Sequence, residues 1–280
     1  MLRILEIIAT IFDAMPFNEV KPRILRAIII ESIVLIIICG ISISLYFRYI
    51  RHPKKNEQTR YLAFTYMSWS GAILFSIIGK VLQYLYTYDI NTTEVGIITN
   101  WNMSLFLVNI GILFHAEFGY VIFPPKNFKK TKIFLKSICI VVSIFILVYP
   151  RYWQGKQIPV VHSIKFGAVF LFLIVTSISF IQKSKRISSF TTSNFLWRKM
   201  KYLKFMHVFF ILVFIFFLIS TIYGSFTDIY YTWLYFSASI CMVISALFGL
   251  LGTKPISDEQ KRLAIEEQKK RKKILSMGEK

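Results

Sequence analysis

Long apolar runs separated by short polar segments dominate the hydropathy pattern of this 280-residue chain. A bilayer core about 30 Å thick needs roughly 20 apolar residues in a helix, and seven runs reach that length. They predict seven transmembrane helices: Arg26–Phe47, Tyr61–Tyr84, Ile98–Phe123, Ile133–Tyr149, Val161–Gln182, Phe205–Tyr223 and Tyr231–Gly252. The predicted fold class is therefore all-α, an integral membrane bundle of seven helices that occupies residues 23–252.

Two further segments flank the predicted bundle. Residues 1–22 begin with a short apolar stretch that carries Arg3 and Glu6, and we expect an amphipathic helix lying in the membrane interface. A transient targeting segment is the alternative, although the stretch has no small-residue cleavage site. Residues 253–280 predict a basic cytoplasmic tail helix, because the capping-box pattern Ser257–Gln260 is typical of a helix start.

Basic residues are divided unequally between the two ends of the predicted helices. Of the 34 Lys and Arg residues, 26 follow the first, third, fifth and seventh helices, and only 6 lie on the other side. Cytoplasmic loops of membrane proteins carry such an excess. The pattern predicts an N-terminus outside and a C-terminus in the cytoplasm of a cell membrane. Tyr and Trp residues gather at the predicted outer ends, where aromatic rings prefer the headgroup layer.

Composition agrees with a membrane protein and excludes other classes. Apolar residues make up 55% of the chain and charged residues 17%, with a mean hydropathy of +0.57, whereas a soluble domain has about 45–50% and about 25%. The net charge of +20 is explained by the basic flanks of membrane helices, so we expect no nucleic-acid partner. The connecting segments are too short for a fused kinase, ATPase or DNA-binding domain.

Small residues predict which helices pack closely, because they let two backbones approach. They recur every four positions in the second and seventh helices: Ser68, Ala72 and Ser76, then Ser237, Cys241, Ser245 and Gly249. The third helix is the most polar, while the sixth is apolar on all sides from Phe209 to Leu218. We expect helices two, three and seven at the centre of the bundle, and helices four and six on its lipid-facing rim.

Two ionisable residues lie inside predicted spans near the outer end. An ionisable side chain there costs roughly 2.5–3.5 kcal/mol on insertion scales, so each needs a partner or a function. Glu31 and Lys80 lie at similar depth, and we interpret them as an ion pair, either structural or part of an outward-facing ligand or ion site. Snorkelling of Lys80 to the headgroups is a third interpretation. Asn102 and Asn109 of the third helix belong to the same candidate polar site.

A second candidate group, His115, Glu117 and His207, lies in the inner half of the predicted bundle. Histidine and carboxylate side chains bind zinc or relay protons. However, positions two apart on a helix point about 200° away from each other, so His115 and Glu117 cannot face one ion. The chain also has no HxxxH or HExxH motif. We expect no metal, no cofactor and no catalytic residue here, and Glu117 alternatively pairs with a basic loop residue.

The predicted tail helix carries a cluster of five basic residues: Lys269, Lys270, Arg271, Lys272 and Lys273. Near a membrane such charges bind anionic headgroups at up to about 1 kcal/mol each. An upright tail would hold the cluster about 24 Å from the bilayer, beyond the Debye length of roughly 8 Å. The headgroup interpretation therefore requires a tail that lies flat, and a solvated basic end is the alternative.

Three functional hypotheses follow from the sequence. The first is a sensory or scaffolding, receptor-like protein that acts through a protein partner or as a homo-oligomer. A carrier or channel subunit is the alternative, and it needs a water path past Glu31, Lys80 and Asn109. An intramembrane enzyme is the least favoured and needs a pocket that joins His115 or Glu117 to His207. A retinal pigment of the usual kind is excluded, because Tyr231–Gly252 contains no lysine for a Schiff base.

Overall fold

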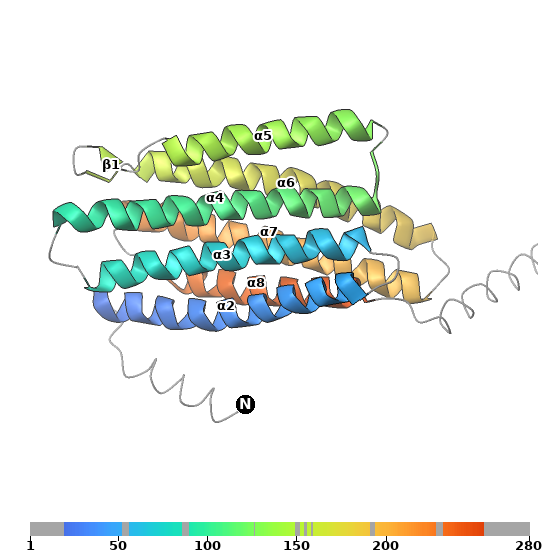
Figure 1. Cartoon of the computed structure of the whole chain (residues 1–280), viewed down its shortest axis with the longest axis horizontal. Helices are drawn as coiled ribbons and strands as arrows, with labels where there is room; N and C mark the ends of the chain where they lie inside the picture. The colour runs from blue at the N-terminus through green and yellow to red at the C-terminus, as the bar shows by residue number, and fades with distance from the viewer. Residues whose placement is uncertain are drawn as a thin grey trace, which may run out of the picture.

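The computed structural model describes residues 20–51, 56–85, 90–125, 127–148, 152–153, 156–157, 159–190, 194–227 and 232–254. Within these residues seven helices are long and apolar enough to cross a membrane. They are α2 (Val20–Arg51), α3 (Glu57–Leu85), α4 (Ile90–Ile122), α5 (Phe128–Val148), α6 (Pro159–Phe190), α7 (Asn194–Thr227) and α8 (Trp233–Gly252) (Figure 1). The prediction of an all-helical, multi-pass membrane protein is confirmed.

Most helices continue past the apolar runs from which they were predicted. For example, α3 starts at Glu57 rather than Tyr61, directly after Asn56, whose side-chain oxygen accepts a hydrogen bond from the Gln58 backbone amide (3.1 Å). A side-chain cap of this kind satisfies an amide that the first turn leaves free. At the other end of the chain, the Thr253 hydroxyl donates to the Gly249 carbonyl (2.9 Å) and closes α8. Polar flanking residues thus extend α3 beyond its apolar run and close α8 at its predicted end.

A short hairpin between α5 and α6 was not predicted. Strand β1 (Tyr152–Trp153) pairs antiparallel with β2 (Lys156–Gln157), with Tyr152 opposite Gln157. Two residues separate the strands in the sequence, and two-residue loops are the commonest hairpin connections. Hydropathy does not identify strands this short, because each spans only one alternation of side chains.

Six of the described helices form a closed ring in the order α2, α3, α4, α6, α7 and α8, since each packs on the next and α8 returns to α2. Helix α5 lies outside this ring, mainly against α4 and only lightly against α6 (Figure 1). Half of the α3 span is buried, compared with 22% of the α5 span. The predicted central positions of α3, α4 and α8 and the rim position of α5 are confirmed.

The sixth predicted helix, α7, corrects the expectation that it faces lipid. It lies between α6 and α8, and Met206, Phe210 and Val213 are fully buried. An apolar residue suits both a lipid-facing surface and a protein core, so a helix that is apolar on all sides carries no signal for either. The prediction was wrong because uniform hydrophobicity does not distinguish these two environments.

Glycines mark the closest approaches between helices. On α8, Gly249 leaves room for the Tyr66 hydroxyl and for Met206, whose sulfur would lie 2.9 Å from a Cβ at that position. One turn earlier, the Ser245 hydroxyl donates to the Met206 carbonyl (2.8 Å). On α4, the indole ring of Trp69 fills the space that a Cβ at Gly111 would need. These contacts hold α3, α4, α7 and α8 at short range, as small residues in membrane helices do.

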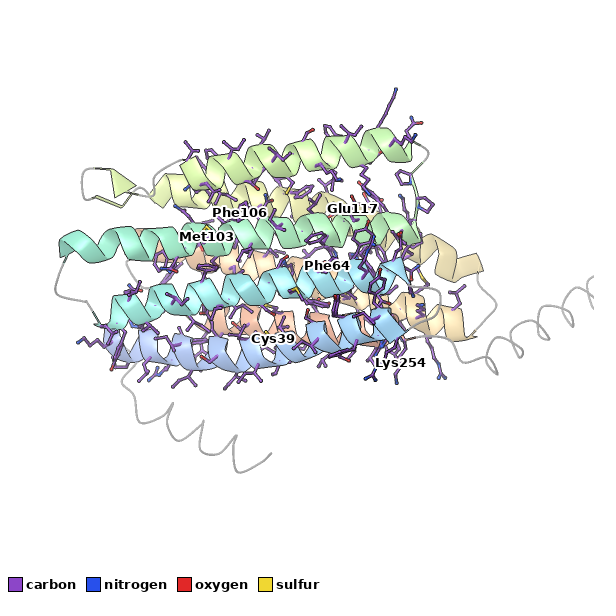
Figure 2. The ribbon with its side chains drawn as sticks, viewed as in Figure 1. Cys39, Phe64, Met103, Phe106, Glu117 and Lys254 are labelled. Carbon is purple, nitrogen blue, oxygen red and sulfur yellow. The ribbon has the colours of Figure 1, made fainter. Side chains whose placement is uncertain are left out.

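Basic residues gather at one end of the described bundle, which we call the basic end. The α2–α3, α4–α5 and α6–α7 connections lie there, and Figure 2 places Lys254 at this end. Its described basic residues are Arg48, Arg51, Arg60, Lys129, Lys130, Lys132, Lys136, Lys183, Lys185, Arg198, Lys199, Lys201, Lys204 and Lys254. The opposite end carries Lys21, Arg23 and Arg26 on α2. Two predicted features lie outside the described residues: nearly all of the N-terminal segment 1–22, and the basic cluster Lys269–Lys273 of the tail.

Candidate functional site

Glu31 and Lys80 form the ion pair that their similar depth in the predicted membrane spans suggests. The Lys80 ammonium lies 2.8 Å from Glu31 Oε2 and 2.9 Å from Oε1, so it bridges both carboxylate oxygens. Glu31 is 7% exposed and Lys80 is 2% exposed. The pair links α2 to α3 near the end opposite the basic end, and Lys80 points into the bundle rather than toward the headgroups.

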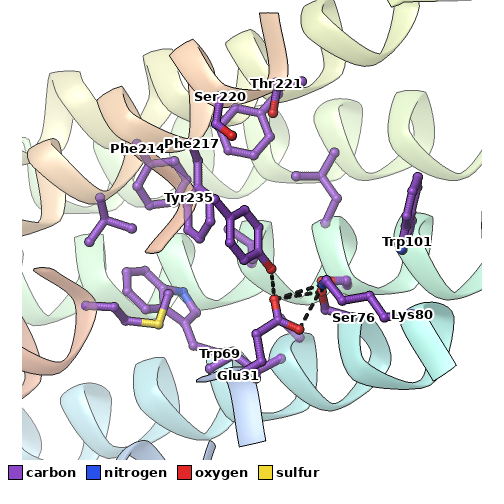
Figure 3. A pocket seen from close by; sticks show the side chains of 18 residues that line it. Glu31, Trp69, Ser76, Lys80, Trp101, Phe214, Phe217, Ser220, Thr221 and Tyr235 are labelled. Atoms are coloured by element: carbon purple, nitrogen blue, oxygen red, sulfur yellow. Dashed lines mark hydrogen bonds and ion pairs between the residues drawn. The ribbon is translucent and has the colours of Figure 1, made fainter. Parts of the chain in front are cut away.

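Two hydroxyl groups complete the arrangement around this carboxylate. Ser76, one helical turn before Lys80 and therefore on the same face of α3, donates to Glu31 Oε1 (3.1 Å). Tyr235 of α8 donates to the same oxygen, and its ring lies 5.3 Å from the Lys80 nitrogen. We call Glu31, Ser76, Lys80 and Tyr235 the charged cluster (Figure 3). It joins α2, α3 and α8 through one carboxylate.

The charged cluster forms one wall of a cavity of about 190 Å³, which we call cavity 1. Helices α3, α4, α6, α7 and α8 supply the other walls, which are mainly aromatic and aliphatic with three hydroxyl groups (Figure 3). Besides the charged cluster, its lining comprises Trp69, Ala72, Ile73, Trp101, Ser104, Leu105, Val108, Phe166, Val213, Phe214, Phe217, Ser220, Thr221 and Met242. An apolar cavity with a few converging polar groups is the usual form of a small-molecule site.

Aromatic rings fix the shape of cavity 1. Trp101 packs on Gly79, where a Cβ would come within 2.9 Å of the indole ring. Trp69 lies edge-on to Phe210 with ring centroids 4.6 Å apart, and Phe214 lies 6.1 Å away. We call Trp69, Phe210 and Phe214 the aromatic layer. Because these rings are large and closely packed, cavity 1 is preformed on the side that faces the middle of the bundle.

The two asparagines of the predicted polar site lie apart from the charged cluster. Asn109 faces α5, where its amide donates to the Cys139 carbonyl (3.0 Å) and the Ser143 hydroxyl (2.9 Å). Asn102 accepts a hydrogen bond from Lys165 (3.2 Å), which also donates to a backbone carbonyl of α5 (2.8 Å). The grouping of Asn109 with Glu31 and Lys80 is therefore corrected. Asn109 attaches α5 to the ring of helices instead.

The histidines of the second candidate group come together, while the carboxylate does not join them. The rings of His115 and His207 are 4.5 Å apart, and both side chains are buried. Glu117 points to α5, where its carboxylate pairs with Lys132 (3.2 Å). This separation agrees with the helical spacing, which turns His115 and Glu117 in opposite directions. In the part of the chain that the structure describes, no three His, Cys, Asp or Glu side chains are grouped to hold a metal.

Sequence reasoning missed two contributors to the buried polar structure. Tyr235 was not identified because several tyrosines near the same end fit an aromatic belt, and a belt tyrosine is explained without any role in a buried site. Arg26 is fully buried near the start of α2, and its place as the first residue of a predicted span gave no sign of this. The only available signal for Tyr235 is its depth in α8, which matches that of Glu31 and Lys80.

Comparison with known proteins does not assign the chain to a family: no family model, curated protein or solved structure matches it. Cavity 1 and the charged cluster are therefore the features from which its function is inferred.

Proposed function

We propose that this protein is a sensor of the cell membrane that binds a small amphipathic ligand in cavity 1 and acts through a protein partner at its basic end. The observation that carries the proposal is that the charged cluster faces a cavity. A buried salt bridge that served packing alone would be enclosed by helix contacts. Here the carboxylate, the ammonium and several hydroxyls converge on a space bounded by aromatic rings, which is the pattern of a ligand site.

The lining of cavity 1 indicates the chemical class of the ligand. Trp69, Trp101 and Phe214 offer flat apolar surfaces, whereas Glu31 and Lys80 offer a paired acceptor and donor. A ligand with an aromatic body and a small polar or zwitterionic group matches both parts. Binding of its polar group would replace some of the contacts within the charged cluster, and this exchange keeps both buried charges partnered.

The charged cluster also provides a route from ligand to partner. Tyr235 and Glu31 join α8 to α2 near one end, and Arg48 of α2 donates to the Leu250 carbonyl of α8 (3.2 Å) near the basic end. A ligand that binds one arrangement of these helices better than another shifts the population toward it. We therefore expect ligand binding to change the surface that the basic end presents.

The positive-inside pattern supports an orientation for this sensor. In this proposal the basic end lies in the cytoplasm, where Lys and Arg residues accumulate in membrane proteins. Cavity 1 then lies in the outer half of the bilayer, so it samples ligands from outside or from the outer leaflet. The partner, a second protein or a second copy of the chain, meets the basic end, where anionic headgroups also bind.

A carrier receives less support from the same geometry. The aromatic layer separates cavity 1 from the histidines, since Phe210 lies 4.6 Å from both the Trp69 ring and the His115 ring. Asn109, which was expected to line a water path, faces α5. Across the described helices, the polar groups thus form separate clusters rather than a continuous path, and the sensor remains the function that we propose.

The proposal is tested by native mass spectrometry of the protein purified from its own membranes in mild detergent. We expect a small molecule bound to each chain, and we expect Ser104→Leu, which fills part of cavity 1, to lose it. Ser44→Leu makes the same change on an exposed face of α2 and is the matched control. A native protein without a bound molecule, or a molecule that Ser104→Leu retains, would contradict the proposal.

A further inference from the structure

A second cavity of about 610 Å³ lies near the basic end between α4, α5 and α6, and we call it cavity 2. Its volume falls within the roughly 300–1,000 Å³ that is typical of small-molecule sites. Rings supply much of its lining: Tyr120, Phe123, Phe134, Phe172 and Phe180. His115 and His207 are also part of the lining. Cavity 2 therefore combines aromatic walls with two buried polar rings that cavity 1 does not share.

The hydrogen bonds of these histidines are incomplete. Nδ1 of His207 lies 2.8 Å from the Leu203 carbonyl, and since a carbonyl only accepts, Nδ1 carries the proton. In the neutral ring Nε2 is then an acceptor. His115 is fully buried, and neither of its ring nitrogens has a hydrogen-bond partner in the described structure. A neutral His115 still offers one donor and one acceptor. A ligand group that both accepts and donates a hydrogen bond would therefore satisfy the two rings together.

The donor set favours a neutral ligand over a metal ion. Two neutral imidazoles would leave a bound cation without a compensating charge among apolar walls, which is unfavourable. The nearest candidate carboxylate, Glu117, is already held by Lys132 at 3.2 Å. Phe180 also stacks on His207 with ring centroids 3.8 Å apart and planes 9° apart. A ligand that exchanges hydrogen bonds without adding charge fits this surrounding.

Cavity 2 opens toward the lipid rather than toward the middle of the bundle. Three of its lining residues, Phe134 of α5 and Leu171 and Val175 of α6, are 65%, 64% and 61% exposed on the outer surface of the helices. In Figure 1, α5 and α6 run side by side along one edge of the bundle, and their mutual contact is slight. A ligand soluble in the bilayer thus reaches cavity 2 between these two helices.

We propose that cavity 2 binds a neutral, membrane-soluble phenol, that is, an aromatic ring with one hydroxyl and an apolar tail. The hydroxyl accepts from a ring nitrogen of His115 and donates to Nε2 of His207, which a single hydroxyl can do because it is both donor and acceptor. The ring packs among Phe172 and Phe180, since aromatic faces and edges attract one another. The tail leaves between α5 and α6 into the lipid.

The test compares 4-nonylphenol with its methyl ether, 4-nonylanisole, by titration calorimetry of the full chain in lipid nanodiscs, with empty nanodiscs subtracted. The ether keeps the ring and tail but cannot donate a hydrogen bond. We expect the native protein to bind the phenol at least tenfold more tightly than the ether. His207→Phe should lower phenol affinity about tenfold and bring the two affinities together, because it removes the acceptor of the phenol proton, whereas His207→Gln, which keeps a donor and an acceptor, should preserve part of the difference. Equal affinities in the native protein, or a preference that survives His207→Phe, would overturn the proposal.

A second pair of variants locates the site even if His207→Phe does not fold. Ala168 lines cavity 2, and Ala168→Phe fills it without altering either histidine. We expect this variant to lose binding of the phenol and of the ether. Ser104→Leu, in cavity 1, should leave phenol binding within twofold of the native value. Loss of phenol binding in Ser104→Leu with retention in Ala168→Phe would place the phenol in cavity 1 and overturn the proposal.

Discussion

At the scale of single residues, Glu31 and Lys80 are buried together as an ion pair. Lys80 continues the stripe of small residues on α3, and Glu31 is the acidic residue at the same depth, so sequence alone was enough to suggest their contact. The structure adds that the ammonium bridges both carboxylate oxygens and that Ser76 and Tyr235 also donate to Glu31. Tyr235 was not predictable, because a tyrosine near a helix end fits the headgroup layer equally well.

Substitution of Lys80 tests the energetic role of the ion pair. We expect Lys80→Met to lower the free energy of unfolding by about 3–5 kcal/mol, because Glu31 is left buried without its cation. The double variant with Glu31→Gln should recover much of this loss, since removing both charges of a buried pair is often nearly neutral. Steric trapping in bicelles measures both values. A double variant as unstable as Lys80→Met alone would show that the two residues do not stabilise each other.

Asn109 offers a second test at this scale. Its amide makes two hydrogen bonds to α5, and Asn109→Leu leaves the Cys139 carbonyl and the Ser143 hydroxyl without this donor. We expect a loss of about 1–3 kcal/mol, the usual cost of such buried groups. Cys139, which is 2% exposed, should then react faster with a maleimide, as site-resolved mass spectrometry would show. Cys39 on α2 is the internal reference, and an unchanged ratio of the two rates would contradict the assigned role of Asn109.

At the scale of helices, hydropathy predicted the number of membrane-spanning segments but not all of their positions in the bundle. Small residues marked α3 and α8 correctly as central, because close backbone approach leaves a visible pattern. The polar residues of α4 likewise identified that helix correctly as central. Helix α7 was misplaced, since phenylalanine and leucine suit a core as well as they suit lipid, and its run from Phe209 to Leu218 contains no polar residue that would separate the two. The short β1–β2 hairpin lies below the length that hydropathy detects.

The close packing of α8 predicts which substitutions its helix contacts tolerate. Ser245→Leu and Gly249→Leu should each destabilise the bundle by about 1–3 kcal/mol, because their new side chains meet Met206 and Tyr66. Ile215→Leu on α7 conserves volume at a half-buried position and should cost less than either. Thermal unfolding in detergent ranks the three. Equal midpoints would remove the packing argument for α8.

At the scale of the whole molecule, a ring of six helices surrounds cavity 1, and cavity 2 lies on the other side of the aromatic layer, between α4, α6 and the outlying α5. The separation of the cavities was not predictable, because it depends on how Trp69 and Phe210 meet across helices that are distant in sequence. The concentration of Lys and Arg at one end was evident from the chain itself. Orientation in the membrane is the whole-molecule property that the positive-inside pattern predicts and that accessibility labelling can measure.

Single cysteines introduced into a cysteine-free background test this orientation. We expect cysteines at Ile90, Gln154 and Thr227 to react with an impermeant maleimide from outside intact cells. Those at Asn56, Phe128 and Phe190 should react only after the membrane is opened, because they lie at the basic end or in its connections. The reverse pattern would overturn the threading and place cavity 1 in the cytoplasmic half of the bilayer.

The central claim is that the charged cluster serves ligand binding as well as stability. Native mass spectrometry of the Glu31→Gln, Lys80→Met double variant tests it most directly, because this variant is expected to fold while lacking both charges that face cavity 1. We predict a folded protein, with an unfolding midpoint close to that of the native chain, which no longer retains the small molecule bound to the native protein. A double variant that folds and retains the same molecule at the same occupancy would contradict the claim and leave the ion pair a purely structural contact.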